Sequence, residues 1–337
     1  VDVADIQQTI LDSPEFQQFA QAARDLTTEW FEAHRAELAS IDENTLPAEL
    51  ITTISEDLLA RFKPVPLLDE YDVYEQLMAY WHEVMSDDVF LIMNEGWLGA
   101  AKPRRTIEDK DRKLNETPDL AIGSGRNAQK YKMDLIPPDL IVARYFAAEQ
   151  AQVDELAAAA EEATRAVEEY IEEHVVEDGL LAEAMDDGKI SNTLAKDRLK
   201  MAKTEFARQS TKVKDAEAGQ TDAAVEIAAL KELIAMYAAE AAAKKAVKVT
   251  KEALDAMTLA SYGDLDAEVV QQLVLDDKWF ATIAERIATE LNATTLSLVN
   301  RIRELGNRYD QTLGELEAQL AELDAREATH LAEMGIS

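Results

Sequence analysis

Residues 67–97 read LLDEYDVYEQLMAYWHEVMSDDVFLIMNEGW and contain the clearest change of pattern in the chain. From Tyr71 to Met85, apolar and aromatic residues recur every three or four positions, which predicts an amphipathic helix. The short apolar run 89–93 that follows is typical of a β-strand, and 94–96 is a predicted turn. Aromatic residues make up only 6% of the chain. Their concentration here makes 67–97 the first place to look for function.

The net charge limits the kinds of partner that the chain can bind alone. Its 337 residues, enough for two domains or for one domain with a long appendage, include 67 acidic and 34 basic residues, a formal charge of −33. Non-specific binding to nucleic acid or to anionic membranes depends on Lys and Arg, so the charge argues against both. A simpler explanation of the charge is that it keeps the chain in solution. Any DNA contact would be local or supplied by a partner.

The composition also limits the chemistry and the compartment. The chain contains no cysteine, which excludes disulfides, thiol catalysis and cysteine metal sites and is typical of a cytoplasmic protein. No apolar run reaches the roughly 18 residues of a membrane span, and the N-terminus has no signal-peptide pattern. We therefore expect a cytoplasmic location and no membrane partner. The first residue is Val1, as expected of a fragment or a processed chain.

The fold class predicted from these patterns is mainly α, with three segments. Residues 1–138 are expected to form a helical core with a small antiparallel sheet, in which 131–136 pairs with the predicted strand at 89–93. Ser13 and Pro14 are typical of a helix N-cap and first helical residue. The core is therefore expected to combine helices with two or three strands.

Residues 139–260 are predicted to form a long antiparallel coiled-coil arm. Two helices of about 36 residues, roughly 54 Å each, lie on either side of a shorter helical segment. Apolar residues recur along them at spacings of three and four, with charged residues between. The seams are rich in alanine, so the helices can approach closely but bury little apolar area per turn. The arm's stability should therefore come from its length.

Residues 261–337 are predicted to contain a short helix and then one long C-terminal helix. An apolar stripe runs along this helix from Leu291 to Leu331, with heptad-like spacing that is irregular at Tyr309. Gly306 and Gly314 lie inside the helix, where each costs about 1 kcal/mol in helix propensity. They indicate a bend or a close approach to another helix.

No set of residues has the spacing of a catalytic or metal site. The four histidines, His34, His82, His174 and His330, are scattered, and none has a neighbour at metal-ligand spacing. The acidic pairs 87–88 and 276–277 each precede a change of structure and are predicted to be capping or turn residues. We therefore predict no catalytic, cofactor-binding or metal residue in this chain.

Basic residues are concentrated only in 102–132. Arg104, Arg105, Lys130 and Lys132 are candidate contacts to DNA phosphates, since phosphate oxygens are bound by Arg and Lys. The alternative is a solvated loop whose charges offset nearby acids.

Four collinear segments carry a family resemblance. They are the stretch at 67–97, DLIPPDLIVARYFAAEQ at 134–150, VLDDKW at 274–279, and the closing HLAEMGIS. Together they resemble the C-terminal half of the modification (methylation) subunit of type I restriction–modification systems. The resemblance covers essentially the whole chain. YDVYEQLMAYW and LIVARYFAAEQ are specific to that group of subunits, whereas the coiled-coil portions are not.

The resemblance implies a region that follows a catalytic domain. The family is an adenine-N6 DNA methyltransferase that uses S-adenosylmethionine. Its catalytic half carries an Asn-Pro-Pro-Phe/Tyr motif and a glycine-rich cofactor motif after a strand, and neither occurs in this sequence. The Pro-Pro at 137–138 follows Ile136 rather than asparagine. No catalytic residue is therefore carried over, and S-adenosylmethionine belongs to the parent protein.

The resemblance also implies partners. In the family, two modification subunits flank one specificity subunit, and their C-terminal helices pack with its helical spacers. The stripe at 291–323 is thus expected to face the specificity subunit, with the restriction subunit as a further partner and DNA bound only in the assembled complex. This expected surface consists of Leu291, Leu298, Ile302, Leu305, Tyr309, Leu313 and Leu316. The stripe could equally pack on the predicted arm, and the alternative function is a free-standing coiled-coil adaptor or chaperone-like protein unrelated to DNA modification.

Overall fold

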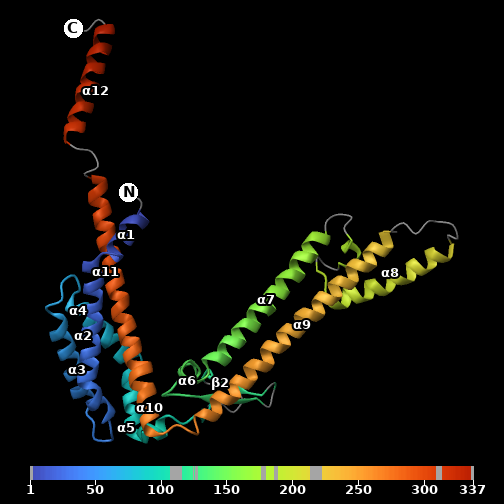
Figure 1. The fold of residues 1–337 in the computed structure, drawn as a ribbon, viewed down its shortest axis with the longest axis horizontal. Coiled ribbons are helices and arrows are strands. Elements are labelled where there is room, and N and C mark those ends of the chain that lie inside the picture. The colour runs from blue at the N-terminus through green and yellow to red at the C-terminus, as the bar shows by residue number, and fades with distance from the viewer. Residues whose placement is uncertain are drawn as a thin grey trace. The chain divides into compact units, whose positions relative to one another are not determined.

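The computed structural model describes residues 3–106, 116–123, 125, 128–175, 180–185, 189–212, 222–308 and 313–334. As predicted, the described chain is mainly helical, with a small antiparallel sheet of three strands (Figure 1). It forms two compact units, one made of Val1–Ala100 with Asp266–Ser337 and the other of Ala101–Leu265. This division differs from the three segments expected from the sequence, because the C-terminal helices group with the N-terminal ones.

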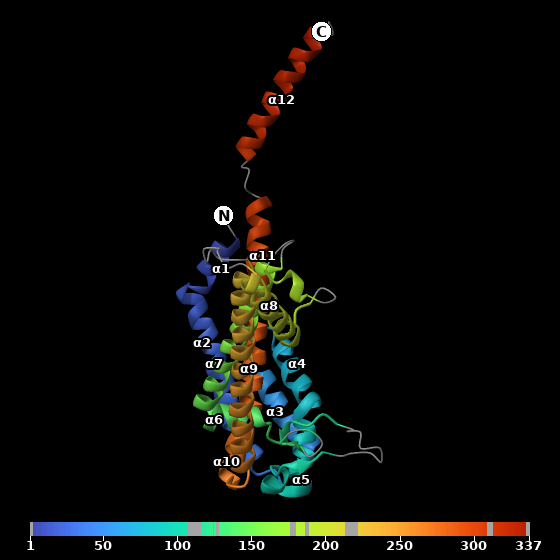
Figure 2. The ribbon, with the colours of Figure 1, turned by 90° about the vertical axis from the view of Figure 1, so that its right-hand side faces the viewer.

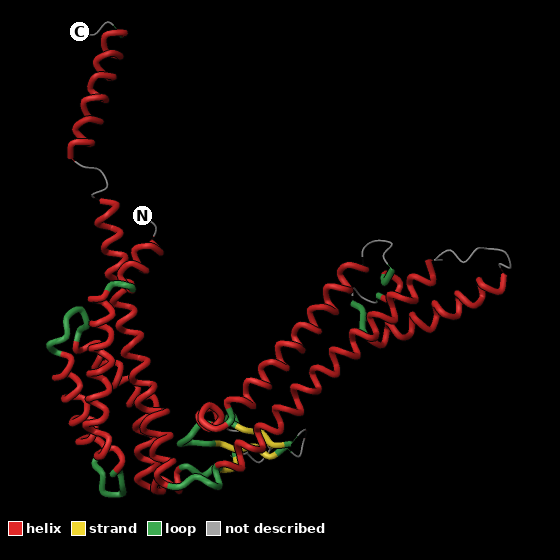
Figure 3. The backbone as a smooth tube through the Cα atoms, viewed as in Figure 1, coloured by secondary structure: helices red, strands yellow, loops and turns green. Residues whose placement is uncertain are grey.

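In its described residues, the first unit contains helices and loops but no strand (Figure 3, helices red and loops green). Its elements are α1 (Val3–Leu11), α2 (Pro14–Ala39), α3 (Pro47–Phe62), α4 (Glu70–Tyr80), η1 (Trp81–Met85), α5 (Ser86–Ala100), α10 (Ala267–Gln272), η4 (Leu273–Phe280), α11 (Ala281–Arg308) and α12 (Leu313–Glu333). The predicted start of α2 is confirmed, since Pro14 is its first residue and the Ser13 side chain accepts a hydrogen bond from the Phe16 amide at 3.2 Å.

The predicted strand at 89–93 is wrong, because these residues lie inside α5. Val89 and Ile92 are fully buried at helical spacing, so the apolar run continues the helical period of 71–85 rather than starting an alternation. Five apolar residues fit either structure, and here the packing of the preceding helix decides between them. The predicted turn falls close to a real break, since Gly96 has φ 68° and ψ 166°, a conformation that favours glycine.

Two π-helical segments, η1 and η4, lie in the first unit. Both are rich in buried side chains, including Trp81 and Met85 in η1 and Leu273 and Trp279 in η4. A π-helix adds a residue to a turn and so rotates the side chains that follow it. The two segments thereby direct polar as well as apolar groups into the core.

The second unit contains the sheet and the long paired helices. Its elements are β1 (Arg104–Arg105), β2 (Leu120–Ile122), β3 (Gln129–Lys132), α6 (Pro138–Tyr145), α7 (Ala147–His174), η3 (Ala182–Ala184), α8 (Asn192–Lys212) and α9 (Asp222–Ser261). The strand order is β1-β3-β2, and both pairings are antiparallel. Of the strand expected at 131–136, only Tyr131 and Lys132 lie in a strand, β3, and this strand pairs with β1 and β2 rather than with 89–93.

Helices α7 and α9 lie side by side and run in opposite directions (Figure 1 and Figure 2). The Thr164 hydroxyl forms a hydrogen bond with Glu240 at 3.1 Å, and the Tyr170 hydroxyl forms one with Glu232 at 3.2 Å. The residue numbers of the paired positions thus increase along α7 as they decrease along α9. Helix α8 packs on α9. The shared core includes four alanines and is made of Val167, Leu181, Ala184, Ala195, Ala202, Ala229, Leu230 and Leu233. The lengths of 28 and 40 residues for α7 and α9 differ from the matched lengths expected, and coiled-coil geometry stays a prediction.

Candidate protein interface

The apolar stripe of α11 changes from buried to exposed along the helix. Leu291 is only 5% exposed and Val299 is buried, so this part of α11 belongs to the core of the first unit. Leu298 is half-buried. Further along, Ile302 and Leu305 are 40% and 38% exposed. Of the predicted partner surface, Leu291 is therefore a core residue, and the exposed part of the stripe begins near Ile302.

Helix α12 exposes every described side chain between residues 314 and 330. Among them, Leu316, Leu320 and Leu323 are 46%, 59% and 58% exposed. Their spacing of four and three places them on one face, since an α-helix turns about 100° per residue. An amphipathic helix normally covers such an apolar face by packing it against another element. The leucine face of α12 is therefore a candidate docking surface.

Two predicted interface residues cannot be placed on this surface. Tyr309 lies outside the described residues, and so does the irregular spacing that was expected there. Leu313 is the first residue of α12, and only its backbone is described. Leu296 was not among the predicted interface residues, and it is 47% exposed. It lies about 120° around α11 from Ile302, so it belongs to a different face.

The candidate phosphate-binding residue Arg104 is held by carboxylates. Its guanidinium donates to both carboxylate oxygens of Glu116 at 2.7 and 2.8 Å and to Asp134 at 2.9 Å. These hydrogen bonds, the Glu116 bonds most strongly, raise the pKa of the Arg104 guanidinium. Lys132 similarly pairs with Asp119 at 2.6 Å. Both residues tie the small sheet to nearby acids, and binding phosphate would require them to leave those acids.

The other two candidate phosphate contacts have different surroundings. The Arg105 guanidinium lies 4.8 Å from the centre of the Tyr131 ring, a cation–π arrangement across the β1–β3 pair. Arg105 is exposed and Lys130 is half-buried. Within the described sheet, Arg105 is therefore better placed than Arg104 to reach an external phosphate.

A buried polar cluster joins α5 to η4. The Lys278 ammonium lies 2.6 Å from Asp88 Oδ2, and the Trp279 indole N–H donates to the same oxygen at 2.8 Å. The side chains of Asp88 and Lys278 are only 5% and 10% exposed. Burial raises the pKa of the Asp88 carboxyl, and Lys278 opposes this rise. The Tyr80 hydroxyl donates to the Lys278 carbonyl at 3.4 Å, and burial raises the pKa of Tyr80 to about 12.

The acidic pairs thus have roles that differ from the predicted capping. Asp88 is the buried partner of Lys278, while Asp276 pairs with Arg35 of α2 through two hydrogen bonds. Both partners are distant in sequence, so local pattern could not identify them. One sequence signal was available, namely that Lys278 and Trp279 directly follow the second acidic pair. Because each of these polar side chains has a partner within the cluster, we interpret the cluster as structural.

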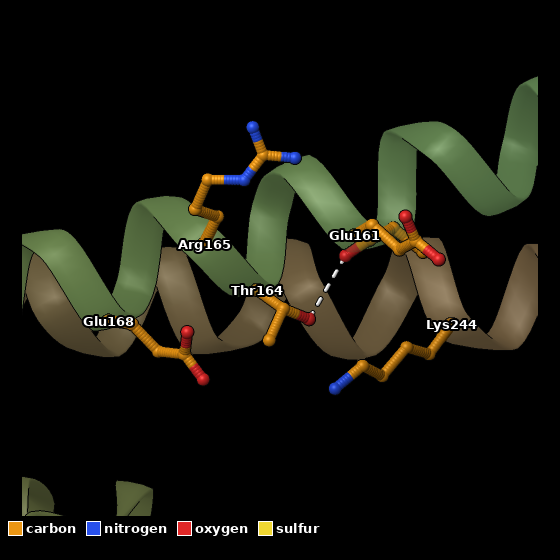
Figure 4. A pocket seen from close by; sticks show the side chains of 6 residues that line it. Glu161, Thr164, Arg165, Glu168 and Lys244 are labelled. Atoms are coloured by element: carbon orange, nitrogen blue, oxygen red, sulfur yellow. Dashed lines mark hydrogen bonds between the residues drawn. The ribbon is translucent and has the colours of Figure 1, made fainter. Parts of the chain in front are cut away.

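A shallow depression on the surface of α7 and α9 contains charged groups but no reactive arrangement. Figure 4 shows its lining, which consists of Ala160, Glu161, Thr164, Arg165, Glu168 and Lys244. The Thr164 hydroxyl donates to the Ala160 carbonyl at 3.0 Å, and Lys244 pairs with Glu240 of its own helix. These are ordinary helix-surface contacts and do not bring an acid, a base and a nucleophile together.

In the part of the chain that the structure describes, no group of three or more His, Asp or Glu side chains converges as a metal site would require. None of the described helices is both long and apolar enough to cross a bilayer. The exposed apolar residues of α11 and the leucine face of α12 are therefore the features that most need a functional explanation. Comparison of the chain with family models, curated proteins and solved structures gives no match.

Proposed function

We propose that this chain is the assembly region of a type I restriction–modification DNA methyltransferase subunit, and that it docks the specificity subunit. The observation that carries the proposal is the row of exposed leucines on α12, together with Ile302 and Leu305 on α11. The sequence segments at 67–97, 134–150 and 274–279 support the choice of family. Catalysis and S-adenosylmethionine binding belong to the parent protein, and the proposed location is the cytoplasm.

The leucine row would provide part of the driving force for docking. Fully burying a leucine side chain contributes about 1.5–3 kcal/mol. Covering the exposed half of Leu316, Leu320 and Leu323 would thus contribute about 1 kcal/mol each, before the entropy of association is subtracted. A helical spacer suits this surface, since a second amphipathic helix can place its own side chains between the leucines. The restriction subunit is proposed as a further partner.

A pull-down of the specificity subunit by variants of α11 tests the proposal. Leu305→Asp places a charge on the exposed stripe and should weaken capture of the specificity subunit by about tenfold or more, since a charge buried without a partner costs several kcal/mol. Leu296→Asp is the matched control, because it changes the same residue type on another face at similar exposure. Circular dichroism should show unchanged helix content in both. Equal capture of the specificity subunit by the two variants would show that the exposed stripe of α11 is not part of the interface.

The reading frame that precedes Val1 gives a second, independent test. The proposal expects an Asn-Pro-Pro-Phe/Tyr motif encoded there. A stop codon directly before Val1 would instead favour the free-standing adaptor. Calorimetry of the present chain with S-adenosylmethionine should show no binding, and measurable binding would contradict an assembly role.

DNA contact within the assembled complex would fall on Arg105 under this proposal. Each phosphate contact contributes about 0.9 to the slope of log affinity against log salt concentration. Arg105→Ala should therefore reduce the slope for the complex by about that amount. An unchanged slope would show that Arg105 does not contact a DNA phosphate in the complex.

A further inference from the structure

An acidic residue interrupts the leucine face of α12. Counting along the helix, Glu327 lies four residues after Leu323 and seven after Leu320, which places it within about 20–40° of both. Leu331 follows four residues later and continues the face. Glu327 is itself exposed. Any helix that covers the leucines would therefore also cover this carboxylate, which then needs a cationic partner.

One border of the leucine face is acidic as well. Glu317 and Asp324 are seven residues apart and lie about 40–60° to one side of Leu320. They occupy the positions from which charges select a partner across a helix pair. Over its whole length, α12 contains six acidic residues and one arginine. The charge pattern is thus distinct enough to identify the kind of helix that would fit.

A second copy of α12 does not fit this pattern in either orientation. In a parallel, in-register pair, Glu327 of one copy would face Glu327 of the other, and facing like charges cost several kcal/mol. In an antiparallel pair, the borders that carry Glu317 and Asp324 would meet each other. Homodimerisation through α12 is therefore unfavourable, although the leucine row alone would permit it.

We propose that α12 docks a basic amphipathic helix from a different chain. This helix carries an apolar row for Leu316, Leu320 and Leu323, a Lys or Arg opposite Glu327, and further cations along the border of Glu317 and Asp324. The inference rests on the proposed docking role of α12 and adds the chemistry of its partner. Charge complementarity selects the partner, and the leucines hold it.

Two synthetic peptides test this pairing against the whole chain. Both are amphipathic helices with the same leucine row, and they differ only in carrying Lys or Glu at the border positions and at the position opposite Glu327. Fluorescence anisotropy at physiological salt should show the lysine peptide binding about tenfold or more tightly than the glutamate peptide. Its affinity should fall as salt is raised, because exposed charges are screened.

Variants of the whole chain sharpen the test. Glu327→Lys should weaken the preference for the lysine peptide, because Glu317 and Asp324 still favour it, whereas Leu320→Asp should abolish binding of both. Thr329→Lys introduces a lysine on the opposite face and should leave the preference unchanged. Equal affinity for the two peptides would overturn the proposal. So would sedimentation of the unmodified chain as a dimer that Leu320→Asp dissociates, since a second copy would then be the occupant.

These experiments distinguish a failure of the basic-partner proposal from a failure of the proposed assembly function. If the lysine peptide binds as expected but the specificity subunit is not captured, the chemistry of the surface stands and the assembly role fails. If the specificity subunit is captured through α12 but Glu327→Lys has no effect on capture or on peptide preference, the assembly role stands and the basic partner is refuted.

Discussion

Lys278→Met should be among the most destabilising single substitutions in the first unit. The variant removes the ammonium that lies 2.6 Å from Asp88 Oδ2 and keeps a side chain of similar length. Because the Asp88 side chain is only 5% exposed, its charge would be left buried and unpaired. Breaking a buried ion pair in this way costs about 3–5 kcal/mol. For a unit of this size, each kcal/mol lowers the melting temperature by roughly 2–4 °C, so the expected shift is about 6–20 °C.

The loss of stability in Lys278→Met should depend on pH, and the protonation of Asp88 determines whether it increases or decreases with pH. Burial already raises the pKa of Asp88 in the folded state, and removing Lys278 would raise that pKa further. A raised folded-state pKa contributes stability below the ordinary aspartate pKa, and this contribution is lost as pH rises through the folded-state pKa. In the variant, Asp88 can escape its burial cost by binding a proton at low pH. The destabilisation should therefore be larger at about pH 8 than at about pH 5.

Tryptophan fluorescence during denaturant unfolding provides the measurement. The four tryptophans of the chain, Trp30, Trp81, Trp97 and Trp279, all belong to the first unit, so the signal reports that unit alone. Lys63→Met, at an exposed position, is the control and should change stability by less than about 0.5 kcal/mol.

A double variant separates lost charge pairing from lost packing. Asp88→Asn combined with Lys278→Met removes both charges while keeping an acceptor for the Trp279 indole. Replacing a buried pair by neutral groups is often close to neutral in stability, so the double variant should be more stable than Lys278→Met alone. A loss under about 1 kcal/mol for the single variant at pH 8, or an equal loss for the double variant, would refute the assignment of this pair as a buried charge partnership.

Three further substitutions test other parts of the structure. Leu230→Ala, in the fully buried core of the paired helices, should cost about 2–5 kcal/mol by leaving a cavity. Thermal melting followed by circular dichroism measures this loss, with the exposed Val249→Ala on the same helix as control. Gly96→Ala should cost about 1–3 kcal/mol through backbone strain alone, since its φ is 68° and no atom would clash with the added Cβ; an unchanged denaturation midpoint would contradict this backbone conformation. Arg104→Ala should destabilise the sheet by only about 1 kcal/mol, because the ion pairs are partly exposed, and faster amide exchange in β1 and β3 would reveal it.

Helices and their starts could be predicted from the sequence because their signals are local. The hydroxyl of Ser13 and the ring of Pro14 act within one turn, and the predicted cap is present. The strand expected at 89–93 was wrong because the signal that decides its structure is not local. Its five apolar residues carry no local preference strong enough to decide, and the period of the preceding helix, which did decide, lies outside that window. The partner strands of β3 were likewise too short to predict, at two and three residues.

The polar core and the candidate interface depend on contacts that the sequence does not display. Asp88 and Asp276 occur in similar acidic pairs, yet one is buried beside a lysine from another segment and the other pairs with Arg35. Leu291 and Leu305 likewise occupy the same stripe at equivalent helical positions. Leu291 is covered by its own unit and Leu305 is exposed, and only the arrangement of the neighbouring helices distinguishes them.

Folding and docking should therefore respond to different substitutions. The stability of the core depends on buried groups such as Lys278. Replacing such a group should lower the stability of the first unit without altering the exposed leucine face. The exposed leucines of α12 bury little area in the chain itself, so replacing Leu320 should leave the unfolding midpoint of the first unit nearly unchanged while weakening association. If Leu320→Asp lowered that midpoint as much as Lys278→Met, the leucine face would already be packed within the chain. The stripe would then be internal structure, as its sequence pattern alone also allows.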